Sequence, residues 1–427
     1  MLRADGAAAW LARLRAAGVR AGDRVACALP PGPGFAALLV AALGERWTFV
    51  PLPPAADLAA AADAVDARVS VDASGAFRTR AAAGPPTPDA RVLLATSGTT
   101  GAPRRLALSD ANLRAVLDSH AGPLALRGAV LLSVLPWHHA FGLVLELLPA
   151  LRAGAPLVRD PSGGRDVASM LDAAERAAAR GAAVTHLHAV PYTTRLLAED
   201  GAGADFLAGL RGGLVGGAPA GASLAASLAR TRLRVGYGQT EASPGICLGD
   251  PGAWRAGALG TPLGCAVRVD DDGVLAFRGP NACLGEWHGV LADRSDGTSP
   301  LERLPADRWV RTGDLAAAEA DGSYTFLGRA AESFKLENGR SVAPLATEDV
   351  VRARYPGVRE AVLSSADGVA LVLAVSGDGP IPTADDVRAL LGALGDRPFR
   401  VVRVARDGWV RTPKGEIDRR FPTGRGP

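Results

Sequence analysis

Short apolar runs alternate with helical patterns over the first half of the chain. The runs RVACALP, TFVPL and RVLLA are separated by helical patterns over 35–43 and 60–67. Later runs, which are AVLLSVLP, APLVRD, AVTHLHAV, GGLVGG and LRVGYG, lead into loops that hold Gly, Ser, Thr or His. This rhythm is typical of an α/β fold. Because ligands bind at the C-terminal strand ends of open α/β sheets, we expect a site in these loops.

The pattern changes in the C-terminal part of the chain. From about residue 260 the predicted strands become shorter, as in AVRVDDDGVLAFRGP and GSYTFLGR. After Arg329 a new α+β pattern begins, with a helix around TEDVVRARY, strands EAVLSS and VALVLAV, a helix DDVRALLGAL and a strand RVVRVA. The sequence therefore predicts a large N-terminal α/β domain of layered sheets and helices over 1–329 and a small α+β domain over 330–427.

Composition and charge indicate a folded protein and argue against a nucleic-acid partner. Apolar residues make up 48% of the chain and charged residues 21%, which is typical of a folded globular protein. The net charge is +3 and no run of five Lys or Arg residues occurs, so we expect no nucleic-acid partner. Four cysteines without CxxC spacing favour a reducing compartment, the cytoplasm; they are Cys27, Cys247, Cys265 and Cys283.

Two apolar segments lack the features of a signal peptide or of a membrane span. The N-terminal DGAAAWLARLRAAG predicts an amphipathic helix capped by Asp5, and it carries Arg13 and Arg15, unlike the apolar core of a signal peptide. The stretch FGLVLELLPALRAGAPLV contains Glu146 and Arg152, so it is too polar to span a bilayer. We expect no membrane association.

A loop rich in hydroxyls and glycines follows the predicted strand RVLLA. The segment TSGTTGAPRR, over 96–105, places four hydroxyl side chains and two glycines in six residues. Glycines allow backbone N–H groups to turn toward an anion and hydroxyls add donors, so the segment suits a triphosphate. It lacks the Gly-Lys-Ser/Thr of a Walker A loop. An ordinary surface loop can have a similar composition, but ten residues in this order are a more specific signal for phosphate binding than composition alone.

Seven further motifs follow this loop in order. They are PWHHAFG (136–142), GGAPA (216–220), YGQTE (237–241), VRTGDLA (310–316), DGSYTFLGR (321–329), KLENGRSVAP (335–344) and RTPKGEIDRR (411–420). Together these segments resemble the adenylate-forming superfamily of acyl-CoA synthetases, peptide-synthetase adenylation domains and luciferases. The resemblance covers most of the chain and implies ATP and Mg²⁺ as cofactors and a mobile small C-terminal domain.

Several motifs supply groups suited to a nucleotide. In YGQTE, Tyr237 offers an aromatic face for adenine, Thr240 a hydroxyl for phosphate and Glu241 a carboxylate ligand for Mg²⁺, although a strand end with a capped helix start has the same appearance. The resemblance implies that Asp314 accepts hydrogen bonds from the ribose hydroxyls and that Arg329 adds a ribose contact. The other expected nucleotide-binding residues are Thr96, Ser97, Gly98, Thr99, Thr100, Gly101, Gly217, Ala218, Pro219, Gly238 and Gln239.

The histidines of PWHHAFG correspond to a family segment that borders the acyl pocket. His139 matches the family histidine in P-x-x-H-x-x-G, so we expect it in the pocket wall and among the catalytic residues. We expect no metal there, because adjacent residues of a strand, such as His138 and His139, point to opposite faces. His186 and His188 share one face of AVTHLHAV and either reach the same pocket or belong to the core.

The phosphate loop and the C-terminal loop both depart from the family pattern. Arg104 stands where a lysine is common, which keeps the charge, so phosphate binding is expected to survive. In the family, a lysine from a loop of the form R-T-x-x-G-K-I-x-R stabilises the attack of a carboxylate on the α-phosphate of ATP. Here RTPKGEIDR places Glu416 at that position. One unit charge near the reaction is worth roughly 4 kcal/mol, so the exchange matters.

Two explanations of Glu416 remain open. Lys414 lies two residues away, about 7 Å in an extended segment, and would present its ammonium from the same face. Lys414 is therefore the expected catalytic cation. Alternatively, the loop has lost its role and Glu416 is an ordinary solvated side chain.

These observations support three functional hypotheses. The first is an AMP-forming ligase that adenylates a small or medium carboxylic acid and transfers it to the thiol of CoA or of a carrier protein's phosphopantetheine, with Gly339 beside the pantetheine path. The second keeps nucleotide activation but uses a nitrogen acceptor or an unusual anion, as in amide synthetases or nitrite-dependent diazotases. The third is a nucleotide-binding protein without catalysis.

Overall fold

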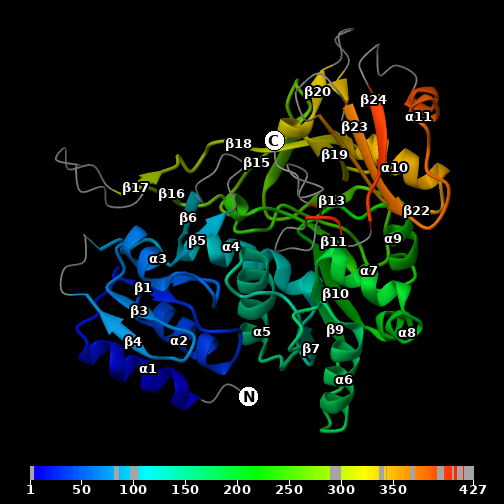
Figure 1. The fold of residues 1–427 in the computed structure, drawn as a ribbon. Helices are drawn as coiled ribbons and strands as arrows, with labels where there is room; N and C mark the ends of the chain where they lie inside the picture. The colour runs from blue at the N-terminus through cyan, green and yellow to red at the C-terminus, as the bar shows by residue number, and fades with distance from the viewer. Residues whose placement is uncertain are drawn as a thin grey trace.

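The computed structural model describes most of the chain (Figure 1). The described residues are 4–80, 86–96, 104–288, 300–335, 341–342, 344–365, 371–391, 399–405, 408–410 and 417. They form two large sheets and a small three-stranded sheet, so the predicted α/β class with a small C-terminal α+β unit is confirmed.

The first sheet has eight strands in the order β17-β16-β6-β5-β2-β1-β3-β4. Strands β1, β2, β3 and β5 run parallel to one another, whereas β4, β6, β16 and β17 are antiparallel to their neighbours. The strands are β1 Arg24–Cys27, β2 Thr48–Pro51, β3 Val69–Val71, β4 Phe77–Thr79, β5 Val92–Thr96, β6 Arg104–Leu108, β16 Gly285–Trp287 and β17 Leu301–Arg303. The phosphate loop of the sequence therefore connects β5 to β6.

The second sheet has eleven strands in the order β14-β15-β18-β19-β13-β12-β11-β10-β9-β7-β8. Its parallel part comprises β7 Leu131–Ser133, β8 Leu157–Arg159, β9 His186–Ala189, β10 Gly212–Gly216 and β11 Arg234–Tyr237. Its antiparallel part comprises β12 Cys247–Leu248, β13 Ala258–Pro262, β14 Ala266–Val269, β15 Val274–Arg278, β18 Val310–Ala318 and β19 Tyr324–Arg329.

Helices fill the space between the two sheets and cover their outer faces. The helices of the first half are α1 Ala4–Ala16, α2 Pro33–Gly44, α3 Leu58–Ala64, α4 Asp110–Leu124, the π-helix η1 Phe141–Leu147 and α5 Leu148–Ala153. Those that cover the far face of the second sheet are α6 Val167–Ala178, α7 Pro191–Glu199, α8 Gly201–Gly209 and α9 Ala222–Leu228. Helix α1 begins at Ala4, so Asp5 lies in its first turn, and the expectation that Asp5 caps this helix is wrong.

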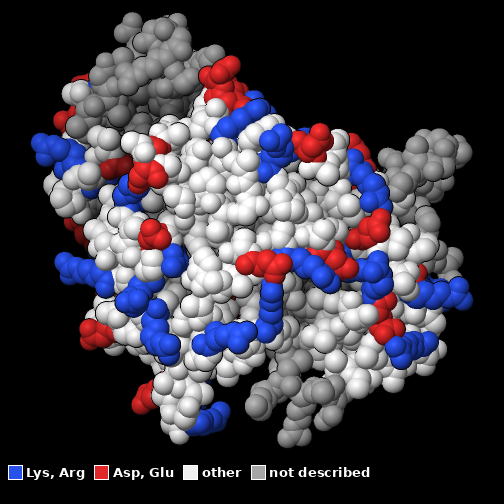
Figure 2. Space-filling model, turned by 180° about the vertical axis from the view of Figure 1, so that it is seen from behind, with Lys and Arg blue, Asp and Glu red and all other residues white. Residues whose placement is uncertain are grey.

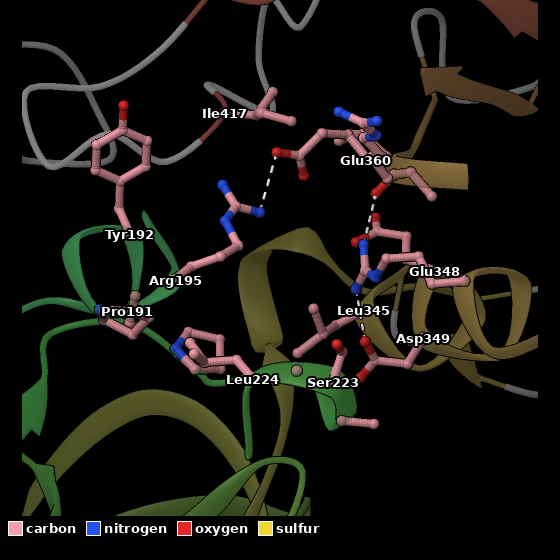
Figure 3. A pocket seen from close by; sticks show the side chains of 18 of the residues that line it. Pro191, Tyr192, Arg195, Ser223, Leu224, Leu345, Glu348, Asp349, Glu360 and Ile417 are labelled. Atoms are coloured by element: carbon pink, nitrogen blue, oxygen red, sulfur yellow. Dashed lines mark hydrogen bonds and ion pairs between the residues drawn. The ribbon is translucent and has the colours of Figure 1, made fainter. Parts of the chain in front are cut away.

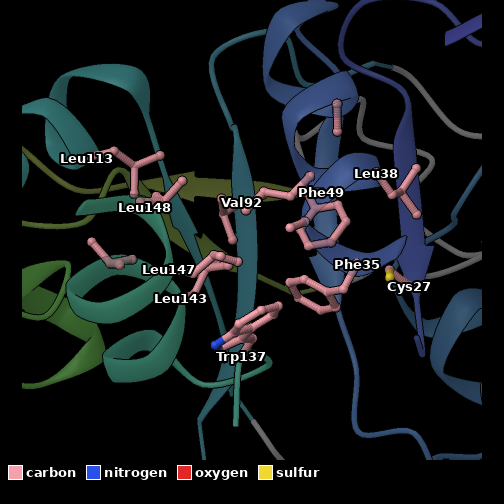
Figure 4. Packing of buried hydrophobic residues seen from close by; sticks show 14 of the residues in the cluster. Cys27, Phe35, Leu38, Phe49, Val92, Leu113, Trp137, Leu143, Leu147 and Leu148 are labelled. Carbon is pink, nitrogen blue, oxygen red and sulfur yellow. The ribbon is translucent and has the colours of Figure 1, made fainter. Parts of the chain in front are cut away.

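The largest core lies where the first sheet meets α2, α4, η1 and α5 (Figure 4). Phe35 of α2 packs edge-on against Phe49 of β2, with ring centroids 5.3 Å apart, and lies 5.7 Å from the ring of Trp137. Leu131 and Leu214 of the second sheet belong to the same cluster. Because one apolar cluster joins both sheets, the loop that contains Trp137 is held between them.

The small C-terminal unit follows β19. It begins with the 3₁₀ turn η3 Ala330–Glu332 and the hairpin β20 Phe334–Lys335 and β21 Ser341–Val342. Its sheet consists of β22 Val358–Ser365, β23 Leu371–Gly377 and β24 Phe399–Arg403, with helices α10 Pro344–Arg354 and α11 Ala384–Leu391. This unit has its own apolar cluster around Val351, Leu373 and Val387, and it lies above the second sheet in Figure 1.

Charged side chains are distributed over the surface without a clear division by sign. Figure 2 shows Lys and Arg interspersed with Asp and Glu on the face opposite to that of Figure 1, which suits the net charge of +3. Such mixed surfaces are typical of solvated faces. Among the described helices, none has the length and apolarity that crossing a bilayer requires.

Candidate active site

A cavity of about 1820 Å³ lies between the second sheet and the small C-terminal unit (Figure 3). The loops that follow the parallel strands β7, β9, β10 and β11 line one side of it with His139, Pro191, Ala218 and Gln239. Helix α10 and strand β22 line the opposite side. The cavity thus lies at the C-terminal ends of parallel strands, where open α/β sheets bind ligands.

A buried carboxylate in the wall of this cavity has two side-chain partners. The side chain of Asp314 accepts a hydrogen bond from the Tyr237 hydroxyl at 2.6 Å and forms an ion pair with Arg329 Nε at 2.9 Å. Burial and the adjacent Asp314 carboxylate raise the pKa of the Tyr237 phenol, so it stays protonated and donates. Burial also raises the pKa of Asp314, while Arg329 and Tyr237 oppose that effect. The arrangement presents a polar, partly neutralised carboxylate to a ligand.

The local sequence explains why these three side chains meet. Residues 310–314 alternate between buried and exposed positions, which places Asp314 on the inner face of β18. The Thr312 hydroxyl donates to the Leu275 carbonyl and accepts from the Asp314 N–H, which fixes the backbone at this point. Asp314 and Arg329 are directly paired residues of β18 and β19. The ion pair is therefore a cross-strand contact, and Tyr237 approaches from the end of β11.

Glycines allow the backbone to approach closely at the same end of the sheet. Gly217, directly after β10, has φ of 87°, a conformation that favours glycine over residues with a side chain. A Cβ atom at Gly238 would lie 1.4 Å from the Pro244 carbonyl oxygen. Both glycines line the cavity together with Ala218, Pro219 and Gln239. The expected nucleotide-binding loops 217–219 and 237–239 are thus brought together beside Asp314.

The histidines of PWHHAFG lie in a turn rather than in a strand. His139 N–H donates to the Pro136 carbonyl at 3.2 Å, and the His138 and His139 rings are neighbours, with centroids 4.4 Å apart. The expectation that the two side chains point to opposite faces of a strand is therefore wrong. His139 lines the cavity, and burial lowers the pKa of His138 to about 4. Within the described part of the chain, no cluster of three His, Cys, Asp or Glu side chains suits a metal.

A buried polar network supports this turn from behind. Glu146 in η1 is fully buried and accepts hydrogen bonds from Ser133 Oγ at 2.7 Å and Trp137 Nε1 at 2.9 Å. Arg159 donates to the Ser133 hydroxyl and to the Leu135 carbonyl. Burial raises the pKa of Glu146 to about 7. The network ties the residue two positions before His139 to the second sheet.

The described residues that were predicted to bind phosphate and metal are not among those that line the cavity: Thr96 ends β5, and Thr240 and Glu241 directly follow the lining residue Gln239. Thr96 and Arg104 are paired across β5 and β6, and the Thr96 hydroxyl donates to the Arg104 carbonyl at 3.4 Å. Glu241 lies in the 3₁₀ turn η2 Thr240–Ala242 directly after β11, and its carboxylate is 3.6 Å from Arg104 Nη1. Thr240 and Glu241 thus adjoin the strand that leaves the phosphate loop.

Several predicted site residues lie outside the described part of the chain. They are Ser97, Gly98, Thr99, Thr100 and Gly101 of the phosphate loop, Gly339, and Lys414 with Glu416 of the C-terminal loop. Ile417 is described and lines the cavity. It packs against a small apolar cluster made of Val362, Ala374, Val404 and Trp409.

The two histidines of β9 belong to the core rather than to the cavity lining. His188 is fully buried and its Nδ1 lies 2.7 Å from the Leu145 carbonyl, while His186 Nδ1 lies 2.9 Å from Thr185 Oγ1. Burial lowers the pKa of both imidazoles, that of His188 to about 4. Of the two alternatives for these residues, the structure favours the core.

Two charged contacts near the site were not expected from the sequence. Arg195 of α7 forms an ion pair with Glu360 of β22 at 3.1 Å across the cavity (Figure 3). Arg104 forms a double hydrogen bond with Glu286 of β16. Neither pair has a sequence signal, because its partners are far apart in the chain and belong to no common motif.

The groups that line the cavity, together with those of the nearby segments β6 and η2, fit a nucleoside triphosphate. The carboxylate of Asp314 suits hydroxyl donors such as those of ribose, the glycines permit close backbone approach, and Arg104 provides a cation beside the phosphate loop. Glu241 and Thr240 carry the hard oxygen atoms that Mg²⁺ prefers.

Comparison with known proteins agrees with this geometry. A family model described as "AMP-binding enzyme" matches residues 59–286, more than half of the chain. The sulfoacetate–CoA ligase of Cupriavidus necator is 33% identical over 298 residues, which are 65% of this chain and 54% of the relative. The long-chain-fatty-acid–CoA ligase FadD15 of Mycobacterium bovis is 35% identical over 129 residues, 30% of this chain and 20% of the relative. The matched region thus spans about a fifth to a half of these curated relatives.

Solved structures resemble the whole chain. The amide bond synthetase McbA of Marinactinospora thermotolerans has a TM-score of 0.78 at 25% identity, covering 97% of this chain and 92% of its own. ATP-bound MatB of Rhodopseudomonas palustris has a TM-score of 0.78 at 22% identity, covering 97% and 90%. The MatB likeness supports the fold alone. With the family-model match and the curated ligases, these findings show that the chain belongs to the AMP-binding enzyme family.

Proposed function

We propose that this protein is an ATP-dependent, AMP-forming ligase that activates a small or medium carboxylic acid and transfers it to the thiol of CoA or of an acyl carrier protein. The observation that carries the proposal is the Asp314 carboxylate, which Tyr237 and Arg329 hold in the wall of a cavity lined by the loops after β10 and β11. The curated CoA ligases that the chain matches support the class of reaction.

The proposed reaction has two steps. A carboxylate oxygen of the acid attacks the α-phosphorus of ATP, so that an acyl–phosphate bond forms as the bond to pyrophosphate breaks. The sulfur of the thiol then attacks the acyl carbon, loses its proton, and AMP leaves with the bonding electrons. Because the first step brings two anions together, cations and hydrogen-bond donors near the α-phosphate provide much of the rate.

Each part of the substrates is assigned to particular residues of this chain. Asp314 and Arg329 bind the ribose, the residues around Tyr237 and Gly217 hold the adenine, and His139 borders the acid. Thr240 contacts phosphate, and Glu241 would hold Mg²⁺, which neutralises phosphate charge when bound.

We further propose that the chain divides into domains 1–329 and 330–427, with the turn after Arg329 as the hinge. Lys414 of the small domain would then place its ammonium near the α-phosphate, in the role of the family lysine that Glu416 replaces. Its near neighbour Ile417 lines the cavity, which supports an approach of this loop to the site.

The decisive experiment measures AMP and pyrophosphate release with a panel of acids, with and without CoA. We expect acid-dependent release of both products and acyl-CoA formation with at least one small acid. If no acid supports turnover although ATP binds, the ligase proposal is wrong.

A second candidate, amide synthesis, is favoured by one observation. McbA, an amide bond synthetase, matches 97% of this chain with a TM-score of 0.78. Mass spectrometry of reactions that contain an acid, ATP and an amine but no CoA would detect the amide. A parallel reaction with nitrite in place of the acid tests the diazotase alternative. Product formation only in the presence of CoA would exclude both.

A further inference from the structure

Arg104 contacts two carboxylates at the exit of the phosphate loop. Its Nε and Nη2 donate to Glu286 Oε1 and Oε2 at 3.0 and 2.6 Å, and its Nη1 lies 3.6 Å from Glu241 Oε1. The three side chains come from three different segments of the chain, β6, β16 and η2. Double contacts of this kind fix the plane of a guanidinium as well as its position.

Backbone pairing holds the two acidic side chains in place around Arg104. Glu286 of β16 lies opposite Leu106 of β6, so it is the diagonal neighbour of Arg104 on one face of the first sheet. The Cys283 N–H donates to the Glu241 carbonyl at 2.8 Å, which attaches η2 to the segment that leads into β16. The arrangement is therefore set by the sheet and does not depend on flexible side chains alone.

The contacts on the two carboxylates differ in strength and in expected role. Glu286 takes both hydrogen bonds of the fork, whereas Glu241 contacts the remaining nitrogen at a longer distance. The hydrogen bonds from Arg104 lower the pKa of Glu286, so the pair stays charged near neutral pH. The Arg104 side chain is still 46% exposed and is open to a ligand.

We propose that Glu286 is a positioning residue that holds the Arg104 guanidinium at the exit of the phosphate loop, where Arg104 binds the triphosphate of ATP. Glu241 would hold Mg²⁺ at the same place. This inference rests on the proposed function, because it assigns further residues to the same nucleotide site. Without Arg104, two carboxylates would face the incoming phosphates and repel them. Without Glu286, the guanidinium would lose its orientation and would pair with Glu241 instead.

The test measures MgATP binding by calorimetry in the absence of any acid, with Glu286→Gln, Arg104→Ala, Arg104→Lys and the double variant Arg104→Ala/Glu286→Gln. We expect Glu286→Gln to raise the dissociation constant about 3–10-fold and Arg104→Ala to raise it about 10–100-fold. Arg104→Lys, which keeps the charge, should recover part of the loss. Asp89→Asn is the control, because it removes the charge of an exposed carboxylate that lies 2.6 Å from Arg303 of β17, in the same sheet as β16, and it should leave binding unchanged.

The double variant separates positioning from a merely structural role. In the Arg104→Ala background the Glu286 carboxylate only repels phosphate, so adding Glu286→Gln should improve MgATP binding rather than weaken it further. Additive losses, or wild-type affinity of Glu286→Gln, would overturn the inference. The proposed ligase activity fails separately, when wild-type protein binds MgATP and no acid supports turnover. Thermal unfolding of each variant shows whether it is folded.

Discussion

At the scale of the residue, the Asp314 carboxylate is the main support for the proposed nucleotide site. It is 3% exposed, carries a hydrogen bond from Tyr237 and an ion pair with Arg329, and still lines the cavity. A buried carboxylate with two partners is costly to place in a fold, so its presence at a cavity wall indicates a binding role. Its register opposite Arg329 could not be read from the sequence, which showed only the two motifs.

Asp314→Asn should weaken ATP binding by at least about tenfold, because hydrogen bonds to a charged acceptor contribute roughly 1.5–3 kcal/mol. Calorimetric titration with ATP measures the effect. Tyr237→Phe removes one donor to Asp314 and should cost less. Equal affinity of Asp314→Asn and wild type would contradict the ribose assignment.

Lys414→Ala should lower acid-dependent exchange of pyrophosphate into ATP by about tenfold or more, because it removes the proposed cation near the α-phosphate. Glu416→Ala should lower it less. A larger loss for Glu416→Ala would show that the wrong side chain of this loop was chosen. Thiol transfer from preformed acyl-adenylate is the internal comparison, since the lysine is proposed for adenylation only.

At the scale of the elements, the π-helix η1 begins two residues after the cavity residue His139 and packs into the core. Its Glu146 accepts hydrogen bonds from Trp137 and Ser133, and Trp137 in turn packs against Phe35 of α2. The sequence showed that the segment around Glu146 is apolar but contains too many charged residues to span a membrane. Its helix type and the partner of its acid were not, because hydrophobic periodicity does not report which carbonyl each N–H reaches.

Glu146→Gln should make stability less dependent on pH. The pKa of Glu146 is about 7 in the folded protein and near 4.5 when unfolded, so the folded state binds the proton more tightly and loses stability as pH rises through this range. The variant should therefore be more stable than wild type by on the order of 3 kcal/mol at pH 8 and nearly equal at pH 4.5.

Urea unfolding of both proteins at the two pH values measures this difference. Glu175→Gln in α6, an exposed glutamate, is the matched control and should show no pH-dependent difference. The same stability difference at both pH values would show that Glu146 is not a buried carboxyl with a raised pKa.

At the scale of the whole molecule, the small unit faces the cavity and meets the rest of the chain across it. Arg195 and Glu360 form an ion pair from α7 to β22, with side-chain exposures of 34% and 18%. Such a half-buried pair contributes at most about 1 kcal/mol, which is small for global stability but relevant to the docking of a small unit.

Arg195→Ala should speed tryptic cleavage after Arg329 a few-fold, because weaker docking exposes the connecting turn more often. The charge-swapped variant Arg195→Glu/Glu360→Arg should restore the wild-type rate. Mass spectrometry of the fragments over time provides the measurement. Arg176→Ala, which removes an exposed ion pair with Asp172 within α6, is the control and should leave the cleavage rate unchanged. If Arg195→Ala is cleaved at the wild-type rate, docking through the Arg195–Glu360 pair is excluded.

The order of elements and the location of the cavity were predictable, whereas the charged contacts around it were not. Apolar runs such as GGLVGG and LRVGYG become β10 and β11, and the loops after them line the cavity. By contrast, His138 and His139 were expected in a strand, yet the chain turns there to enter η1. The Arg104–Glu286 contact joins residues 182 positions apart, so only the pairing of β6 with β16 reveals it.

Arg329 takes part in two separate features of the structure. It is the last residue of β19, directly before η3, and it is also the cation paired with Asp314. A displacement of η3 that moves Arg329 would change the charge beside Asp314, at the proposed ribose site. Nucleotide affinity and the orientation of the small unit are then thermodynamically linked. If the nucleotide stabilises one orientation by a given free energy, the protein in that orientation binds the nucleotide more tightly by the same free energy.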